Sequence, residues 1–190
     1  MLRPKVSPEK LSLLPLIAGT VVRRVLQEEF GGTEELQDFI LKWPNDVQAV
    51  STEGEIKKIC GILCELKLEA EVVVCGIGIN TAMYESDLPV PTATSLTLLG
   101  LDESKERVQR IVEKIQAGMM DAVTNLEDGV LQASDLVQEI STIGKEVSAE
   151  LPNGEFIRGK VAGLSDIGEL IINTSNGPRA ISAAEVTHLR

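Results

Sequence analysis

The sequence is short of basic residues: 18 lysines and arginines stand against 29 aspartates and glutamates, which gives a formal net charge of −11 over 190 residues. A dedicated nucleic-acid binder normally carries a basic face that neutralises phosphates, so we expect no DNA partner. A small anionic ligand is not excluded, because a few local cations and backbone N–H groups can bind one inside an acidic protein.

Long apolar runs are also missing. No uninterrupted apolar segment approaches the roughly 20 residues that span a bilayer. Residues 1–5 are followed by a polar Ser-Pro-Glu-Lys segment, where a secretory signal would have its apolar core. We therefore expect a soluble, cytoplasmic protein with no membrane partner, long enough for one medium domain and one small one.

Histidine and cysteine are scarce. His188 is the only histidine and lies two residues from the C-terminus, so triad chemistry is not expected. The sequence has three cysteines, an odd number, and each stands among Val, Ile or Leu: Cys60, Cys64 and Cys75. No further Cys or His stands at a spacing typical of metal ligands. We interpret all three as buried structural thiols and expect no metal site.

Hydrophobic periodicity predicts two long helices. Ser12 is expected to cap the first, which extends to Gly31-Gly32, and Ser104 to cap the second. A weaker helix is expected over residues 130–140. Between the long helices the pattern changes to β-rich runs that predict an antiparallel meander with one face available to helices. These runs cover residues 39–50, 56–68 and 71–79.

From Gly144 onward the sequence changes to short strands separated by turn residues, including Asn153-Gly154 and Asn176-Gly177. Roughly five strands fit in this segment, which predicts a small barrel of the SH3 type. The expected fold class is α+β, with a mixed or antiparallel sheet packed against helices and a C-terminal SH3-like barrel. The expected domains are residues 1–143 and 144–190.

Three segments rich in polar residues and glycine fall within the β-rich region. An unpaired polar side chain is costly to bury, so one shared ligand site would explain all three. Each segment alone also has a simpler interpretation: a proline turn, an exposed edge-strand lysine, and a bulge or crowded crossing, respectively. The segments are Lys42-Trp43-Pro44-Asn45-Asp46, Lys58-Ile59-Cys60-Gly61-Ile62-Leu63 and Gly76-Ile77-Gly78-Ile79-Asn80.

Strand alternation sharpens this hypothesis. Lys57 and Lys58 are neighbours in a strand, so their side chains must point to opposite faces of the sheet. By strict alternation Lys58 and Gly61 also lie on opposite faces, but the absence of a side chain at Gly61 would let a ligand approach the backbone closely. Gly76 and Gly78 leave one face of their strand without side chains, which makes a floor for a flat ligand.

Taken together, the three segments resemble biotin protein ligase. Ala93-Thr94-Ser95-Leu96 and the small terminal barrel follow in matching order, so the resemblance runs from about Leu2 to Arg190. It implies a class II synthetase-like catalytic domain and a two-step reaction. Biotin and MgATP give biotinyl-5′-adenylate, and a lysine of a biotin carboxyl carrier protein, from acetyl-CoA carboxylase or a related carboxylase, then attacks the mixed anhydride. Homodimerisation is left open.

The resemblance also implies residue roles. Lys58 would contact the biotin carboxylate and the α-phosphate and stabilise developing charge, and Asp46 would lie near the incoming carrier lysine. These two are the expected catalytic residues. The expected biotin-binding residues are Lys58, Gly61, Ile62, Leu63, Gly76 and Gly78, and the expected nucleotide-binding residues are Lys42, Asn45, Asp46 and Asn80, with Asn80 reading adenine.

The chain departs from the family in two respects. Family members carry an upstream glycine- and arginine-rich loop that closes over the adenylate, and no Gly-Arg-Gly-Arg segment occurs in this sequence. The separation of Asp46 from Lys58 also predicts a longer hairpin. We therefore expect a partial catalytic domain with impaired adenylate retention: a truncated ligase, one part of a split ligase, or a non-catalytic binding or dimerisation module. A lipoate-ligase relative is the weaker enzyme alternative, because the tryptophan-containing segment and the barrel favour biotin.

Overall fold

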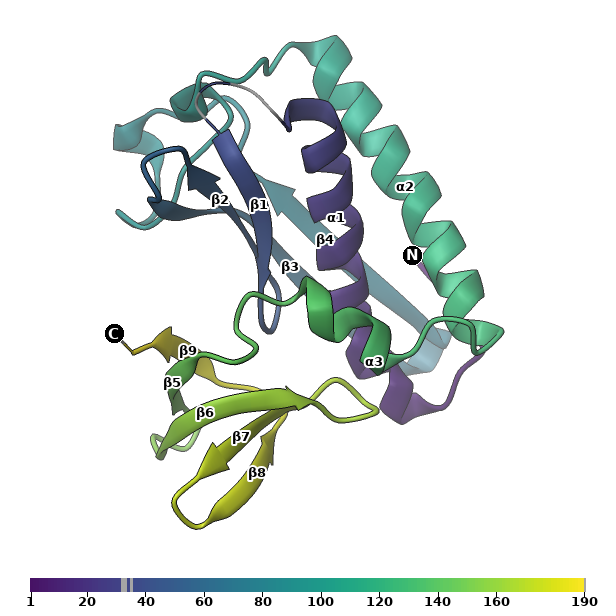
Figure 1. The fold of residues 1–190 in the computed structure, drawn as a ribbon. Helices are drawn as coiled ribbons and strands as arrows, with labels where there is room; N and C mark the ends of the chain where they lie inside the picture. The colour runs from purple at the N-terminus through teal and green to yellow at the C-terminus, as the bar shows by residue number, and fades with distance from the viewer. Residues whose placement is uncertain (32–33, 35, 190) are drawn as a thin grey trace.

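The computed structural model describes residues 1–31, 34 and 36–189; the expectations that reach Gly32 and Arg190 lie outside these residues. The chain forms a four-stranded antiparallel sheet with long helices on one face, and a five-stranded antiparallel sheet follows it (Figure 1). This is the α+β architecture that the sequence predicts.

The first sheet is a meander in the order β1-β2-β3-β4. The predicted run over residues 39–50 proves to be two strands, because the chain reverses at Trp43-Pro44-Asn45. The turn interpretation of that segment is therefore correct. A 3₁₀ turn, Leu68–Ala70, joins the last two strands, where the predicted runs 56–68 and 71–79 meet. The strands are β1 (Leu36–Lys42), β2 (Asp46–Ser51), β3 (Ile56–Lys67) and β4 (Val72–Ile79).

Helices α1 (Leu14–Phe30) and α2 (Lys105–Glu127) lie on the same side of this sheet (Figure 1). Gly19 of α1 rests against Leu41, and a Cβ atom at that position would collide with the leucine, so the glycine allows the helix to approach the strands closely. Among the described residues, no helix combines the length and the apolar character that crossing a membrane requires.

The predicted cap of α2 is confirmed, since the Ser104 hydroxyl accepts a hydrogen bond from the Arg107 N–H at 3.3 Å. The predicted cap of α1 is wrong. Ser12 lies inside a preceding 3₁₀ turn, Pro8–Leu13, and its hydroxyl is within hydrogen-bond distance of the carbonyl of Ile167 in the second sheet. A tertiary contact thus takes the group that local reasoning assigned to the helix end.

The predicted helix over residues 130–140 is shorter than expected. It consists of α3 (Ala133–Leu136) followed by a 3₁₀ turn, Val137–Glu139. The chain then runs beside β1, where the Ser141 N–H donates to the Leu41 carbonyl at 2.8 Å. A longer helix would prevent this pairing.

The second sheet has the order β8-β7-β6-β5-β9 and is the predicted SH3-like barrel. Its predicted turns separate the strands as the Asn-Gly pairs indicate. The strands are β5 (Glu146–Glu150), β6 (Phe156–Leu164), β7 (Leu170–Thr174), β8 (Gly177–Ile181) and β9 (Glu185–His188).

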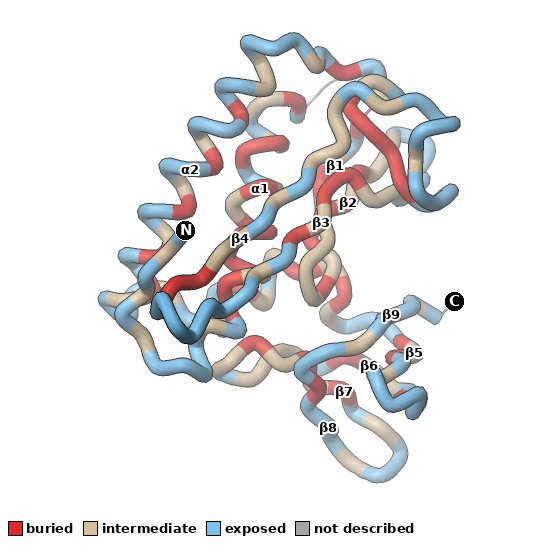
Figure 2. The backbone as a smooth tube through the Cα atoms, turned by 180° about the vertical axis from the view of Figure 1, so that it is seen from behind, coloured by how far each residue is buried: buried red, intermediate tan, exposed pale blue. Residues whose placement is uncertain are grey.

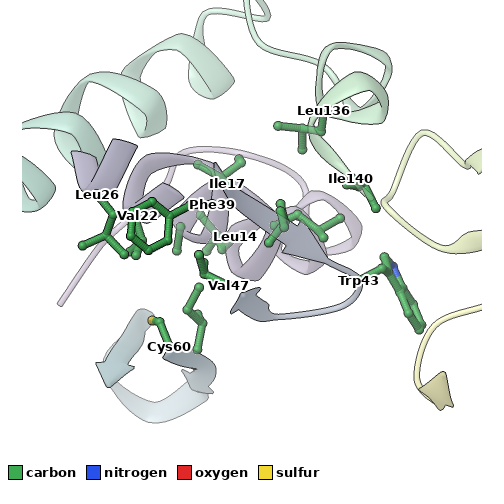
Figure 3. Packing of buried hydrophobic residues seen from close by; sticks show 14 of the residues in the cluster. Leu14, Ile17, Val22, Leu26, Phe39, Trp43, Val47, Cys60, Leu136 and Ile140 are labelled. Atoms are coloured by element: carbon green, nitrogen blue, oxygen red, sulfur yellow. The ribbon is translucent and has the colours of Figure 1, made fainter. Parts of the chain in front are cut away.

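The buried apolar residues of helices, meander and barrel form one continuous cluster. Figure 3 shows Leu14 and Ile17 of α1 near Phe39 and Val47 of the sheet, with Trp43 extending toward the barrel. The opposite face of the meander carries no helix, and much of β3 and β4 is exposed or half-buried when seen from that side (Figure 2).

Candidate functional site

Most of the predicted site residues lie on the helix-free face of the meander. Lys42, Asp46, Gly61 and Gly78 lie directly opposite one another across all four strands. Residues directly opposite in an antiparallel sheet share a face, so these four positions form one row. We call this surface, together with Lys58, Leu63 and Gly76, the ligand face.

A β-bulge brings Lys58 to the ligand face. The register between β2 and β3 shifts so that Val47 is opposite Cys60 while Gln48 is opposite Lys58, which leaves Ile59 as the extra residue. A Cβ atom placed on Gly61 would lie 3.3 Å from both Cε and Nζ of Lys58. The prediction that these residues share no face is therefore wrong, because the bulge breaks the strict alternation.

Lys58 and Asp46 form an ion pair on this face, with 2.5 Å between Nζ and Oδ1. The Asp46 side chain is 22% exposed and that of Lys58 is 41% exposed. Oδ1 is buried and has no hydrogen-bond partner among the described residues, so the ammonium is its close counter-charge. The Lys58 ammonium is thus held by Asp46 above Gly61 and remains accessible from solvent.

Gly76 and Gly78 form an open floor beside this pair. A Cβ atom at Gly76 would meet only the Leu63 carbonyl at 3.6 Å, and one at Gly78 only the Gly61 carbonyl at 3.8 Å, which are ordinary contacts. Neither glycine has a positive φ. Neither the backbone conformation nor the packing therefore requires glycine at these two positions. A flat ligand that lies on the strand would require it, because a side chain would occupy the same space.

The backbone of Lys58 is fixed by a segment from outside the sheet. Its N–H donates to the Thr92 carbonyl and its carbonyl accepts from the Thr94 N–H, both at 2.8 Å. The Asn80 side-chain amide donates to the Thr94 carbonyl at 2.9 Å. These hydrogen bonds to Lys58 were not predicted from the sequence. The signal that could have revealed them is the polar pair Thr94 and Ser95, which is buried within an apolar stretch.

Three predicted site residues are placed differently. The Asn45 side-chain amide donates to the Ile62 carbonyl at 2.6 Å, and the amide of Asn80 is engaged as described above, so both donors serve the fold in this conformation. The Ile62 side chain is 2% exposed and contacts α1 near Gly19, on the helix-covered face. It can contribute only backbone to the ligand face, because strand alternation turns its side chain away.

Trp43 anchors the β1–β2 turn to the barrel. Trp43 points toward the second sheet (Figure 3). The residue is 2% exposed, and its indole N–H donates to the Gly168 carbonyl at 3.0 Å. Sequence reasoning gave Trp43 no role of its own, because its partner lies 125 positions away. The tryptophan connects the turn that carries Asn45 and Asp46 to the second sheet.

His188 and the three cysteines are not part of the ligand face. His188 of β9 is half-buried, and burial, followed by the charges of Lys42 and Lys145, lowers its pKa. Cys60 is buried as predicted, and burial raises its pKa to about 12. Cys64 and Cys75 are only half-buried, so the prediction that all three thiols are buried is wrong for these two.

A large cavity lies elsewhere. It has a volume of about 1090 Å³ and is bordered by the β2–β3 hairpin and the loop that includes residues 88–91 and 97–100. Lys57 lines it and Lys58 does not, which agrees with the opposite directions predicted for the two lysines. Within the described ranges, no group of three or more His, Cys, Asp or Glu side chains could hold a metal ion.

The profile of the family described as "Biotin protein ligase C terminal domain" matches residues 142–189. Among curated proteins, the chain is 32% identical to the biotin–[acetyl-CoA-carboxylase] ligase of Mycobacterium tuberculosis over 79% of this chain and 53% of the relative. It is 29% identical to the bifunctional ligase/repressor BirA of Bacillus subtilis over 98% of this chain and 56% of the relative. The chain thus spans about half the length of the curated relatives it matches.

Solved structures match over the whole chain. A crystal structure of biotin protein ligase from Aquifex aeolicus has a TM-score of 0.74 and 30% identity, covering 100% of this chain and 79% of that one. The same ligase solved with biotin and ATP has a TM-score of 0.73 and 28% identity, covering 100% and 75%. With this identity over most of a solved member, and with the fold and the order of the three segments shared, the chain belongs to the biotin protein ligase family.

Proposed function

We propose that the ligand face forms part of a biotin–protein ligase site, in which biotin is activated by ATP and transferred to a lysine of a carrier protein. The observation that carries the proposal is the bare floor of Gly61, Gly76 and Gly78 beneath the Lys58 ammonium. Backbone and packing do not explain the last two glycines, while a flat ring system on the strand does.

In the first step, a biotin carboxylate oxygen attacks the α-phosphorus of ATP, a P–O bond forms, and pyrophosphate leaves. Negative charge builds up around the α-phosphate, and Lys58 is the cation within reach of the floor. The Lys58 ammonium, which pairs with Asp46 in this structure, would have to turn to the carboxylate and phosphate oxygens when the substrates bind. Once positioned there, it stabilises the charge that develops in the transition state. The backbone hydrogen bonds to Thr92 and Thr94 hold the lysine in place.

In the second step, the amine of a carrier lysine attacks the biotinyl carbonyl of the adenylate, an amide forms, and AMP leaves. The attacking amine must be neutral, and Asp46 is proposed to accept or orient its proton once Lys58 has turned to the phosphate. Lys42, at the end of the same row, is proposed to contact the nucleotide.

The nucleotide is proposed to lie toward Asn45 and Asn80, at the edge where the Thr92–Thr94 segment joins β3. Each side chain retains a free amide oxygen that could accept from an adenine amino group. Mg²⁺ is proposed to arrive with the ATP phosphates, since the described residues do not assemble three metal ligands of their own.

A matched pair of lysine variants tests the proposal. Lys58→Ala should abolish biotin-dependent ATP–pyrophosphate exchange and the rise in melting temperature that saturating biotin or adenylate produces by binding the native state. Lys57→Ala is the control, because Lys57 points to the other face and pairs with Glu55 at 3.1 Å. Equal exchange in the two variants, or no stabilisation of the unmodified chain by biotin or its adenylate, would overturn the proposal.

The proposal also covers organisation and partners. Residues 1–143 are proposed as the catalytic part and residues 144–190 as the barrel domain, in line with the family profile that begins at residue 142. The proposed partner is the biotin carboxyl carrier protein of acetyl-CoA carboxylase or a related carboxylase, and the proposed location is the cytoplasm. The name of the Mycobacterium tuberculosis relative supports this substrate class.

A further inference from the structure

Two cysteines outside the ligand face lie directly opposite each other. Cys64 of β3 and Cys75 of β4 are partners in the antiparallel register, and both are free and half-buried. They lie on the helix-covered side of the sheet, two residues along from the opposed pair Ile62 and Ile77. The proposed ligase chemistry uses neither thiol.

The backbone places this pair at close range. The N–H and the carbonyl of Val73 both bond to Leu2, at 2.9 and 2.8 Å, so they point away from β3. Hydrogen-bond direction alternates along a strand, and Cys75, two residues further on, therefore also directs its backbone groups away from β3. Cys64 and Cys75 thus form a non-hydrogen-bonded pair, whose Cα atoms lie roughly 4.5 Å apart, inside the roughly 4.4–6.8 Å range of disulfides.

The two thiols are also accessible and unequal. Cys75 borders an apolar groove of about 450 Å³ between β4 and α2, lined by Ile77, Ile111 and other apolar residues. Contact with the neighbouring thiol lowers the pKa of Cys75 and raises the pKa of Cys64. Because Cys75 also borders the groove, we take it as the thiol that a peroxide reaches first. Cys60, by contrast, is 1% exposed and has no cysteine opposite it.

We propose that Cys64 and Cys75 form a redox-modification site, which a peroxide converts to an intramolecular disulfide. The Cys75 thiolate attacks one peroxide oxygen, the O–O bond breaks, and a sulfenic acid and hydroxide form. The Cys64 thiol then attacks the sulfenic sulfur, and its proton leaves with the hydroxyl as water. Two thiols lose two electrons, and one peroxide takes them up as two waters once the hydroxide regains the proton lost by Cys75.

The disulfide would fasten β3 to β4 next to the ligand face. The adjacent opposed pair, Leu63 and Gly76, belongs to the floor of that face. Cross-linking a hairpin restricts the unfolded chain, so the oxidised protein should melt at a temperature about 3–8 °C higher than the reduced protein. The proposal is independent of whether biotin binds.

The test uses the whole chain treated with hydrogen peroxide and then alkylated under denaturing conditions. The expected product is monomeric, takes up alkyl groups only at Cys60, and gives a linked Cys64–Cys75 peptide that dithiothreitol separates. Cys60→Ser should give the same linked peptide, whereas Cys64→Ser should stop at a Cys75 sulfenic acid that dimedone traps. The linked peptide is measured in the unmodified chain, so the result does not depend on the variants folding.

Other products would overturn the proposal. These are three thiols that remain free, a disulfide that includes Cys60, a disulfide between two chains, or oxidation of Cys75 to the sulfinic acid while Cys64 stays reduced. A difference in melting temperature between the oxidised and the reduced protein, without the linked peptide, would also count against the proposal.

Discussion

Replacing Glu29 by glutamine should destabilise the chain at neutral pH and should remove part of its sensitivity to acid. The Glu29 side chain is 6% exposed and contacts three cations: Lys114 at 2.8 Å, Arg107 at 3.0 Å and Arg110 at 3.2 Å. Hydrogen bonding to Lys114 above all, supported by the two arginines and opposed by burial, lowers the pKa of Glu29 from 4.5 to about 2.

The size of the effect follows from the two pKa values. One pKa unit corresponds to about 1.36 kcal/mol, so a difference of about 2.5 between the two pKa values stabilises the folded chain by at most about 3.4 kcal/mol. Arg110 and Lys114 are 50% and 40% exposed, and solvent screens their charges. We therefore expect Glu29→Gln to reduce the free energy of unfolding by about 1–2 kcal/mol at pH 7.

The pH dependence has a fixed sign. Because the folded pKa lies below the unfolded one, the stabilisation is fully present above pH 4.5 and is lost as the pH falls toward 2. Urea unfolding followed by circular dichroism between pH 7 and pH 3 measures it. The gap between the unmodified chain and Glu29→Gln should shrink steadily below pH 4.5.

Glu28→Gln is the matched control. Glu28 is 64% exposed and, among the described residues, pairs only with Lys114, at 3.3 Å, so its loss should change the free energy of unfolding by less than about 0.5 kcal/mol. The reasoning is refuted if Glu29→Gln costs no more than Glu28→Gln at pH 7, or if its cost stays constant down to pH 3.

Three further substitutions test the site and its support. Gly78→Ala should leave the free energy of unfolding unchanged or raise it by up to about 1 kcal/mol, yet weaken biotin binding in calorimetry; unchanged binding would contradict the floor. Trp43→Phe should cost about 1–3 kcal/mol in urea unfolding, because the buried Gly168 carbonyl loses its donor. Gly168→Ala should cost more than Gly154→Ala: both have φ near +82°, but only at Gly168 does the new Cβ meet a neighbour, Leu13 at 2.9 Å. Equal melting temperatures for these two alanine variants would contradict the expected clash between the new Cβ atom at position 168 and Leu13.

Local sequence signals were sufficient for most of the fold. The three- and four-residue spacing of apolar side chains gives α1 and α2, and the Asn-Gly pairs give the barrel turns, because both depend on residues close together in the chain. The split of residues 39–50 into two strands also followed from a local cause, the proline turn that begins at Trp43. The ends of elements were less predictable: Ser12 bonds to the barrel and does not cap α1.

Charges on α2 show the limit of such reasoning. Arg107, Arg110 and Lys114 have the spacing of a solvated helix face. In the structure they converge on one enclosed carboxylate of α1, more than 75 positions away. Helical periodicity says which residues share a face, but not which residue of another element that face meets.

The sequence by itself predicted one shared site for the three polar-and-glycine segments and showed the resemblance to biotin protein ligase. Tertiary structure decided how that site is assembled. The bulge at Ile59 turns Lys58 over Gly61, the hydrogen bonds of Thr92 and Thr94 hold the lysine there, and alternation sends Ile62 to the helices. The physical reason is that side-chain direction depends on strand register, and register is set by pairing between segments that no local pattern connects.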